Sequence, residues 1–224
     1  MKILTRREWL RLMSGSSVAL AWAMADLRSA LAAETIKPGV ARLRGPVRVN
    51  GIVAKAGTPV NPGDVIVTGP KSEVAAVIGR DAFLIRENSR VEFGGNAGDA
   101  VVQAMRVVTG AMLSVFGKGQ RRDLRTATAT IGIRGTGIYV EVSPDRTYAC
   151  TCYGEAELVP VDDPGAAEVV RTKHHDAPRY IYPKGMPRMI EAAPVINHTD
   201  TELALLESLV GRTVPFPPYA PYPS

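Results

Sequence analysis

Residues 127–140 have the sequence ATATIGIRGTGIYV, in which three glycines interrupt a run of Thr, Ile, Tyr and Val. The order of these glycines differs from a dinucleotide-binding fingerprint, and no Gly-Lys-Ser/Thr of a phosphate loop follows them. Because β-branched and aromatic residues favour strands, the run from Gly137 to Val142 predicts a strand. We expect Gly135 to supply a backbone conformation that a side chain would block.

The same pattern extends on both sides of this stretch, from Gly39 to about Val161. Short β-forming runs are separated by turn residues at intervals of about 8–12 residues, which indicates an all-β sandwich, barrel or roll. The sharpest turn signal is Asn50-Gly51, since a type I′ turn needs positive φ at both central residues. The charged segment 120–123 (QRRD) is expected to be a solvated loop. The main expected strands are at residues 47–49, 65–68, 73–78, 82–86, 101–108, 111–116, 137–142 and 147–153.

Several of these runs carry a family pattern. In chain order they are GPVRV at 45–49, VNPGDVIVT at 60–68, ENSRV at 87–91, VTGAML at 108–113 and the stretch 127–140. On these motifs, residues 45–161 resemble the FecR domain, the periplasmic domain of ferric-citrate regulator proteins. The resemblance implies a β-roll or sandwich over residues 39–161 with no established catalytic site, so we do not expect an enzyme. It also makes Arg134, Gly135 and Thr136 the structural motif of the family, with Arg134 forming structural hydrogen bonds rather than binding a ligand.

The N-terminus predicts export. Residues 5–11 (TRREWLR) match the twin-arginine signal pattern, and a weakly apolar run from Leu12 to Ala25 follows. Ala30-Leu31-Ala32 offers a cleavage site, so residues 1–32 are expected to be a twin-arginine signal peptide and the protein to be periplasmic. This route carries folded proteins, often with a cofactor. Regulators of the FecR family have a cytoplasmic region and a membrane helix in this place, so this chain is not expected to touch a cytoplasmic sigma factor.

Charge and hydropathy narrow the range of partners. Removing residues 1–32 takes away five of the 27 basic and two of the 22 acidic residues, so the formal net charge falls from +5 to +2. So small a charge makes no case for nucleic acid or anionic lipid. No second apolar stretch is long enough for a membrane span, so none is expected after cleavage of the signal. The expected partner is an envelope protein or a glycan.

Residues 162–224 form a C-terminal extension that the family pattern does not cover. A turn at 162–165 (DDPG) precedes an expected strand at 168–173. Thr199 and Glu202 fit a capping box, which predicts one short helix near residues 200–210. Gly211 is well placed to end this helix, and a proline-rich tail follows it.

The two cysteines and three histidines are the residues most suited to chemistry. In a Cys-x-Cys strand segment, Cys150 and Cys152 point to the same side. Alignment to the family makes Ala149 and Thr151 face the core, so the thiols should face the extension. All three histidines (His174, His175 and His198) lie in the extension. We expect at most one of His174 and His175, neighbours on a strand, to share a site with the thiols.

Three interpretations of these five residues stay open. Thiolate and imidazole ligands would suit zinc, copper or iron, and a bound metal would protect two free thiols in an oxidising compartment. Alternatively, the cysteines are small buried apolar residues and the histidines make ordinary hydrogen bonds. The third interpretation is a strained, switchable disulfide.

Two functions are therefore compatible with the sequence. The first is a non-catalytic periplasmic binding, scaffold or signalling module. The second is a small periplasmic metal-binding or redox protein that uses the cysteines and histidines. The metal content of the exported protein separates the two.

Overall fold

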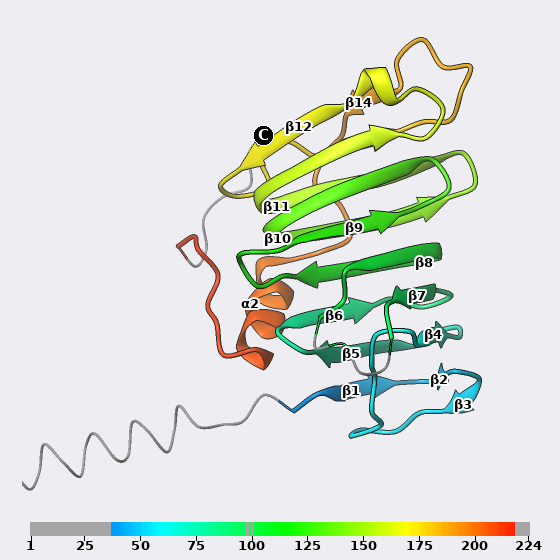
Figure 1. The fold of residues 1–224 in the computed structure, drawn as a ribbon, viewed down its shortest axis with the longest axis vertical. Coiled ribbons are helices and arrows are strands. Elements are labelled where there is room, and N and C mark those ends of the chain that lie inside the picture. Colours follow the sequence, from blue (N-terminus) through cyan, green and yellow to red (C-terminus); the bar gives the residue numbers. More distant parts are fainter. Residues whose placement is uncertain (1–36, 97–98, 100, 218–224) are drawn as a thin grey trace, which may run out of the picture. The chain divides into compact units, whose positions relative to one another are not determined.

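A computed structural model describes residues 37–96, 99 and 101–217 of the chain. The expected signal peptide and the last seven residues of the proline-rich tail lie outside the described residues. The described part is an all-β fold with one short C-terminal α-helix, as the sequence predicts (Figure 1). The helical segments are the short 3-10 helix η1 (Pro164–Ala166) and α2 (Asp200–Leu209). The strands are β1 (Gly39–Arg44), β2 (Val47–Val49), β3 (Ile52–Val53), β4 (Val65–Thr68), β5 (Glu73–Ile78), β6 (Asp81–Ile85), β7 (Arg90–Gly94), β8 (Ala104–Val115), β9 (Arg121–Arg125), β10 (Ala129–Ser143), β11 (Arg146–Pro160), β12 (Glu168–Thr172), β13 (Arg179–Ile181) and β14 (Ile190–Ala192).

Three long strands fold one continuous sheet into two layers. The first half of β8 pairs with β7 and the second half with β6. Likewise, β10 pairs with β9 and then with β8, and β11 pairs with β13 and then with β12. Each strand changes partners at a glycine with positive φ, which is +78° at Gly110, +57° at Gly135 and +90° at Gly154. A Cβ atom at Gly110 would lie 2.1 Å from the Ser89 hydroxyl oxygen, so this bend requires glycine.

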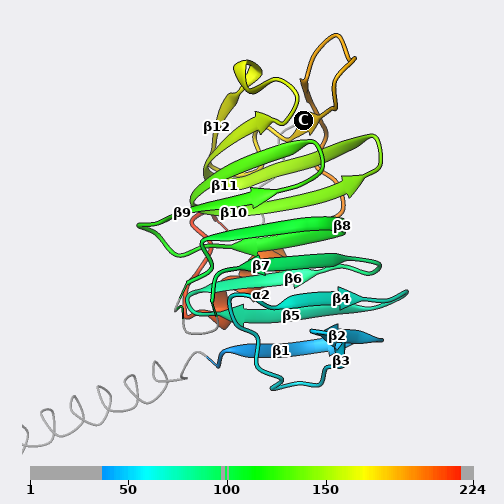
Figure 2. The same ribbon diagram turned by 45° about the vertical axis from the view of Figure 1, so that its right-hand side comes forward.

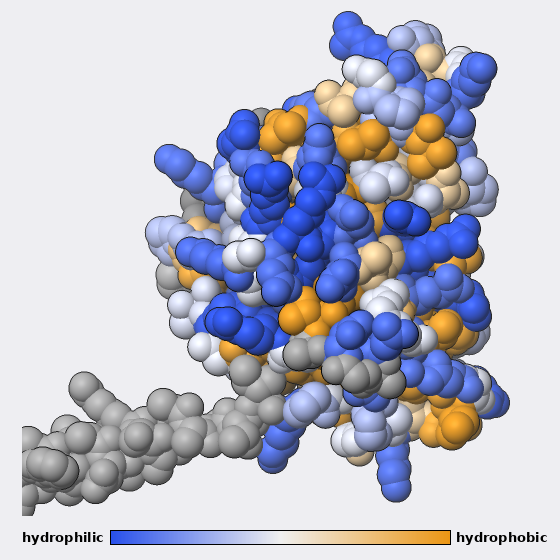
Figure 3. Space-filling model, viewed as in Figure 1, coloured by the Kyte–Doolittle hydropathy of each residue, from blue (hydrophilic) through white to orange (hydrophobic). Residues whose placement is uncertain are grey.

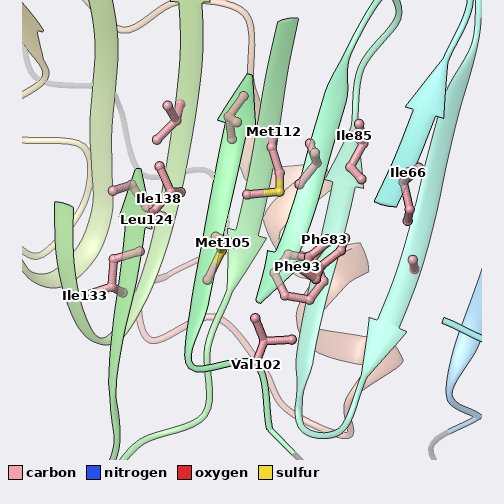
Figure 4. Packing of buried hydrophobic residues seen from close by; sticks show 14 of the residues in the cluster. Ile66, Phe83, Ile85, Phe93, Val102, Met105, Met112, Leu124, Ile133 and Ile138 are labelled. Atoms are coloured by element: carbon pink, nitrogen blue, oxygen red, sulfur yellow. The ribbon is translucent and has the colours of Figure 1, made fainter. Parts of the chain in front are cut away.

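The main core lies between the two layers (Figure 4). Phe83 and Phe93 meet there edge to face, with ring centroids 4.9 Å apart. Strands β4 and β7 contribute every second residue, because their other face meets solvent. Strands β5 and β6 are instead buried on both faces, which explains their nearly continuous apolar sequences EVAAVI and DAFLI.

The turn between β2 and β3 is confirmed as the sequence predicts it. Asn50 has a φ of +51° and Gly51 a φ of +81°, the two positive values that a type I′ turn needs. The Asn50 side chain adds a hydrogen bond of 2.7 Å from its Nδ2 to Asp64 Oδ1.

The prediction of a solvated loop at residues 120–123 is wrong. Residues 121–125 form β9, and the Arg122 side chain is only 4% exposed. Its guanidinium donates to the carboxylate of Asp81, which is 1% exposed, with Nη2 to Oδ2 at 3.0 Å. Burial raises the pKa of Asp81 against the opposing effects of the Gly117 amide and Arg122. The ion pair is thus desolvated and joins β9 to β6.

The extension covers the outer face of one layer and also adds strands to the sheet. β12 and β13 pair with β11, and β14 pairs with β13, although the sequence predicted only the first of these strands. Helix α2 lies against β6 and β8, as Figures 1 and 2 show from two directions. Its Leu203 and Leu206 are fully buried in a second apolar cluster, together with Leu113 and Tyr139 of the sheet.

The start of α2 follows the prediction in detail. Thr199 is the N-cap and forms the complete capping box with Glu202. Glu202 also pairs with Arg86, at 2.8 Å between Oε1 and Nη1. Although burial by itself raises the pKa of Glu202, the bonds with Arg86 and Thr199 outweigh it and lower the pKa. Hydrogen bonds therefore fix the helix end to the sheet.

The face of the molecule in Figure 3 is largely polar. Hydrophilic residues dominate the face in Figure 3, and hydrophobic ones form small separate patches. Among the described residues, we find no helix with the length and apolar character needed to cross a membrane.

Candidate metal centre

Both cysteines lie on β11 beneath the extension. Cys150 and Cys152 are fully buried in the cluster that α2 covers, whereas Ala149 belongs to the core between the layers. This confirms the alternation predicted from the sequence. Both cysteines are free thiols, so the structure contains no disulfide between them.

His175 reaches the thiols from the loop after β12. Its backbone amide donates to the carbonyl of Cys152 at 2.9 Å, and its φ is +53°. This left-handed conformation, unusual for a residue other than glycine, turns the ring toward β11. Its Nδ1 lies 3.3 Å from Cys150 Sγ, and the side chain is fully buried.

His198 arrives from the opposite side, one residue before the N-cap of α2. Its ring stacks on Tyr139, with centroids 4.6 Å apart and planes 14° from parallel. Its Nδ1 lies 2.6 Å from the carbonyl oxygen of Ile196, and its Nε2 lies 3.0 Å from His175 Nδ1. The stacking and the carbonyl hold the ring in one orientation.

Four ligand atoms therefore converge from three segments of the chain. They are Cys150 Sγ, Cys152 Sγ, His175 Nδ1 and His198 Nε2, which all lie within 4.8 Å of one another. In a tetrahedral zinc site the ligand atoms are about 3.3–3.8 Å apart, given the usual zinc–sulfur and zinc–nitrogen bond lengths. The observed 3.0 and 3.3 Å differ from these separations by a few tenths of an ångström. The residues fit a Cys₂His₂ metal centre.

The hydrogen bonds around the two rings determine where their lone pairs point. The Ile196 carbonyl can only accept, so the Nδ1 of His198 carries the proton and its Nε2 presents a lone pair. The Nε2 of His175 lies 3.1 Å from Asp200 Oδ1, so its proton is on that side and Nδ1 presents a lone pair. In these tautomers the two lone pairs face each other across 3.0 Å, and a cation between them, either a metal ion or an added proton, would remove their repulsion.

The two thiols have pKa shifts of opposite direction. Burial by itself raises the pKa of the Cys150 thiol, but bonds with Cys152, His175 and His198 outweigh it and hold that pKa well below its ordinary value. Burial and the neighbouring Cys150 sulfur raise the pKa of Cys152 well above its ordinary value. Two cysteine sulfurs next to two imidazole nitrogens are a ligand set for a soft or borderline cation.

The structure does not bring His174 to the thiols. The chain leaves β12 at Thr172, so both neighbouring rings, rather than one, turn toward Asp200. His174 Nε2 lies 2.9 Å from Asp200 Oδ2, and Asp200 Oδ1 accepts from His175. Sequence reasoning missed Asp200, the first residue of α2, because no spacing relates it to histidines about 25 positions earlier. The only feature of the sequence that could have identified Asp200 is its position two residues after His198.

The motif of Arg134, Gly135 and Thr136 has a structural role. The register of β10 and β11 shifts there, and the Thr136 hydroxyl lies 2.9 Å from the carbonyl oxygens of both Arg134 and Glu155. It also accepts from the Glu155 amide at 3.1 Å. Thr136 and the Arg134 backbone thus carry the hydrogen bonding, while the Arg134 side chain is exposed.

Comparisons with known proteins add little to this geometry. No protein-family model matches the chain. No curated protein matches it either. Two crystal structures of a candidate anti-sigma factor from Parabacteroides distasonis are similar, with TM-scores of 0.49 and 0.48 and 9% sequence identity. Each similarity covers 64% of this chain and 64% of the other, which is less than two thirds of the other protein.

Proposed function

We propose that this chain is an exported, non-catalytic binding or signalling module of FecR type whose extension is fixed in place by one zinc ion. The ion would be held by Cys150, Cys152, His175 and His198. The observation that carries the proposal is the convergence of two imidazole nitrogens, 3.0 Å apart, with two buried thiols. A metal ion satisfies all four groups at once.

Burial supports a structural ion rather than a catalytic one. Three of the four proposed ligands are fully buried and His198 is 5% exposed. Four protein ligands leave no open position for water or substrate, the arrangement typical of structural zinc sites. Zinc also has no redox chemistry of its own, so it would protect the thiols in an oxidising compartment.

The origin of the ligands supports a role in holding the extension. Cys150 and Cys152 belong to the sheet, whereas His175 and His198 belong to the segment that covers it. An ion bound by all four residues would cross-link these parts, and its binding free energy would add to their folding. The ion would thus keep the extension in one conformation on the sheet. The module would then present a fixed surface to its partner, which we propose to be an envelope protein or a glycan.

The proposal is tested by the metal content of the exported protein, purified without chelator. We expect one zinc ion per chain in the unaltered protein and an ion that a chelator removes far more readily from His198→Ala, because one of the four protein ligands is lost. Asn197→Gly is the matched control, since residue 197 has a φ of +59° that glycine adopts without strain. This control should keep its ion. If the protein contains copper or iron instead of zinc, the four ligands stand and only the identity of the metal changes. A metal-free protein that takes up no added zinc would overturn the proposal.

A further inference from the structure

A second group of ligand atoms lies behind the proposed zinc centre. It consists of His174 Nε2, His175 Nε2 and a carboxylate oxygen of Asp200, all within 4.8 Å of one another. The two rings stand nearly perpendicular, with centroids 4.9 Å apart and an angle of 76°. His175 thus belongs to both groups, through Nδ1 on the inner side and Nε2 on the outer side.

The outer group is the one that solvent can reach. The Asp200 side chain is 23% exposed and that of His174 is 10% exposed, whereas His175 is fully buried. His174 also lines a cavity of about 760 Å³ between residues 212–217, which follow α2, and the bend shared by β10 and β11. Neither cysteine lines this cavity, so His174 is the residue of the two groups that an entering ion would meet first.

We propose that His174, His175 and Asp200 form an outer site for a divalent transition-metal ion, which is occupied while the ion passes to the Cys₂His₂ centre. This inference rests on the proposed function. Two imidazoles and a carboxylate bind such ions, but less tightly than a set with two thiolates, so the ion moves inward. When the ion binds Nε2 of each neutral imidazole, the ring proton that had pointed to Asp200 is carried on Nδ1 instead, and it returns to Nε2 when the ion moves on.

The charges around the cavity make this route testable. Lys118 and Lys173 are exposed on its wall and oppose an entering cation. Arg212 also lines it, but its guanidinium is paired with the carboxylate of Glu207. Replacing Lys173 by Glu therefore makes the approach to His174 more favourable for a cation without touching a ligand.

The test measures how fast the metal-free full-length protein takes up cobalt(II), followed by the cobalt–thiolate absorption in a stopped-flow instrument. We expect His174→Ala to slow uptake at least about tenfold and to reach the same final spectrum with one ion per chain. We expect Lys173→Glu to accelerate uptake several-fold at low salt, and this gain to disappear at high salt. Lys184→Glu makes the same charge change on an exposed loop outside the cavity and should leave the rate unchanged.

Whether His174→Ala slows or speeds cobalt uptake distinguishes the outer site from a role of His174 in packing. If His174 only packed against Phe216 within the extension, its loss would loosen the extension and speed uptake. An unchanged or faster rate in His174→Ala overturns the outer site, and an unchanged rate in Lys173→Glu overturns the route through the cavity. A protein that never develops the cobalt–thiolate band would instead contradict the proposed zinc centre.

Discussion

Replacing Cys150 and Cys152 together with alanine abolishes metal binding and lowers the stability of the extension. Two imidazoles alone cannot retain a buried ion against competing chelators, so metal content should fall from one ion per chain to none. At a free metal concentration about 1,000 times the dissociation constant, a bound ion adds about 4 kcal/mol to the free energy of unfolding. The double variant should lose that contribution, which metal analysis and thermal unfolding would measure.

The control for this experiment lies between the two cysteines. The Thr151 hydroxyl is buried without a hydrogen-bond partner, so Thr151→Val changes the same strand without removing a ligand. This variant should keep its ion. If the cysteines serve only as packing, chelator would leave the unfolding temperature of the unaltered protein unchanged, and that result would contradict the metal centre.

Asp81→Asn destabilises the β-roll by about 3–5 kcal/mol, because it leaves the buried guanidinium of Arg122 without its counter-charge. The loss is large because Asp81 accepts both from Arg122, at 3.0–3.2 Å, and from the Gly117 amide at 2.9 Å. Urea unfolding followed by circular dichroism measures it.

The neighbouring pair of Arg121 and Asp123 on β9 provides a matched control. These side chains are 47% and 40% exposed, so Asp123→Asn should cost at most about 1 kcal/mol. Equal losses of unfolding free energy in Asp81→Asn and Asp123→Asn would show that burial does not determine the strength of these ion pairs.

The fold was predictable where local rules operate. Alternation along β11 placed the thiols on the covered face, and Asn50-Gly51 placed a type I′ turn, because both depend only on neighbouring residues. The charged sequence around Arg122 predicts a loop instead of β9, since the acid that permits burial of Arg122, Asp81, is 41 positions away in the sequence. Gly110 likewise predicts a break between two strands where the structure has a bend within β8, because a glycine is typical of both features.

The candidate site was predictable in composition but not in geometry. Cys-x-Cys and the three histidines identify the possible ligands. The choice of His175 over His174 depends on a left-handed residue after β12, which composition does not reveal. The role of Asp200 depends on how α2 docks, a tertiary contact between segments distant in sequence.

The most direct test of the metal centre is X-ray absorption at the metal edge of the protein purified without chelator. We predict two sulfur ligands at about 2.3 Å and two nitrogen ligands at about 2.0–2.1 Å around one zinc ion. A first shell with only nitrogen and oxygen ligands, or a protein without bound metal, would contradict the account.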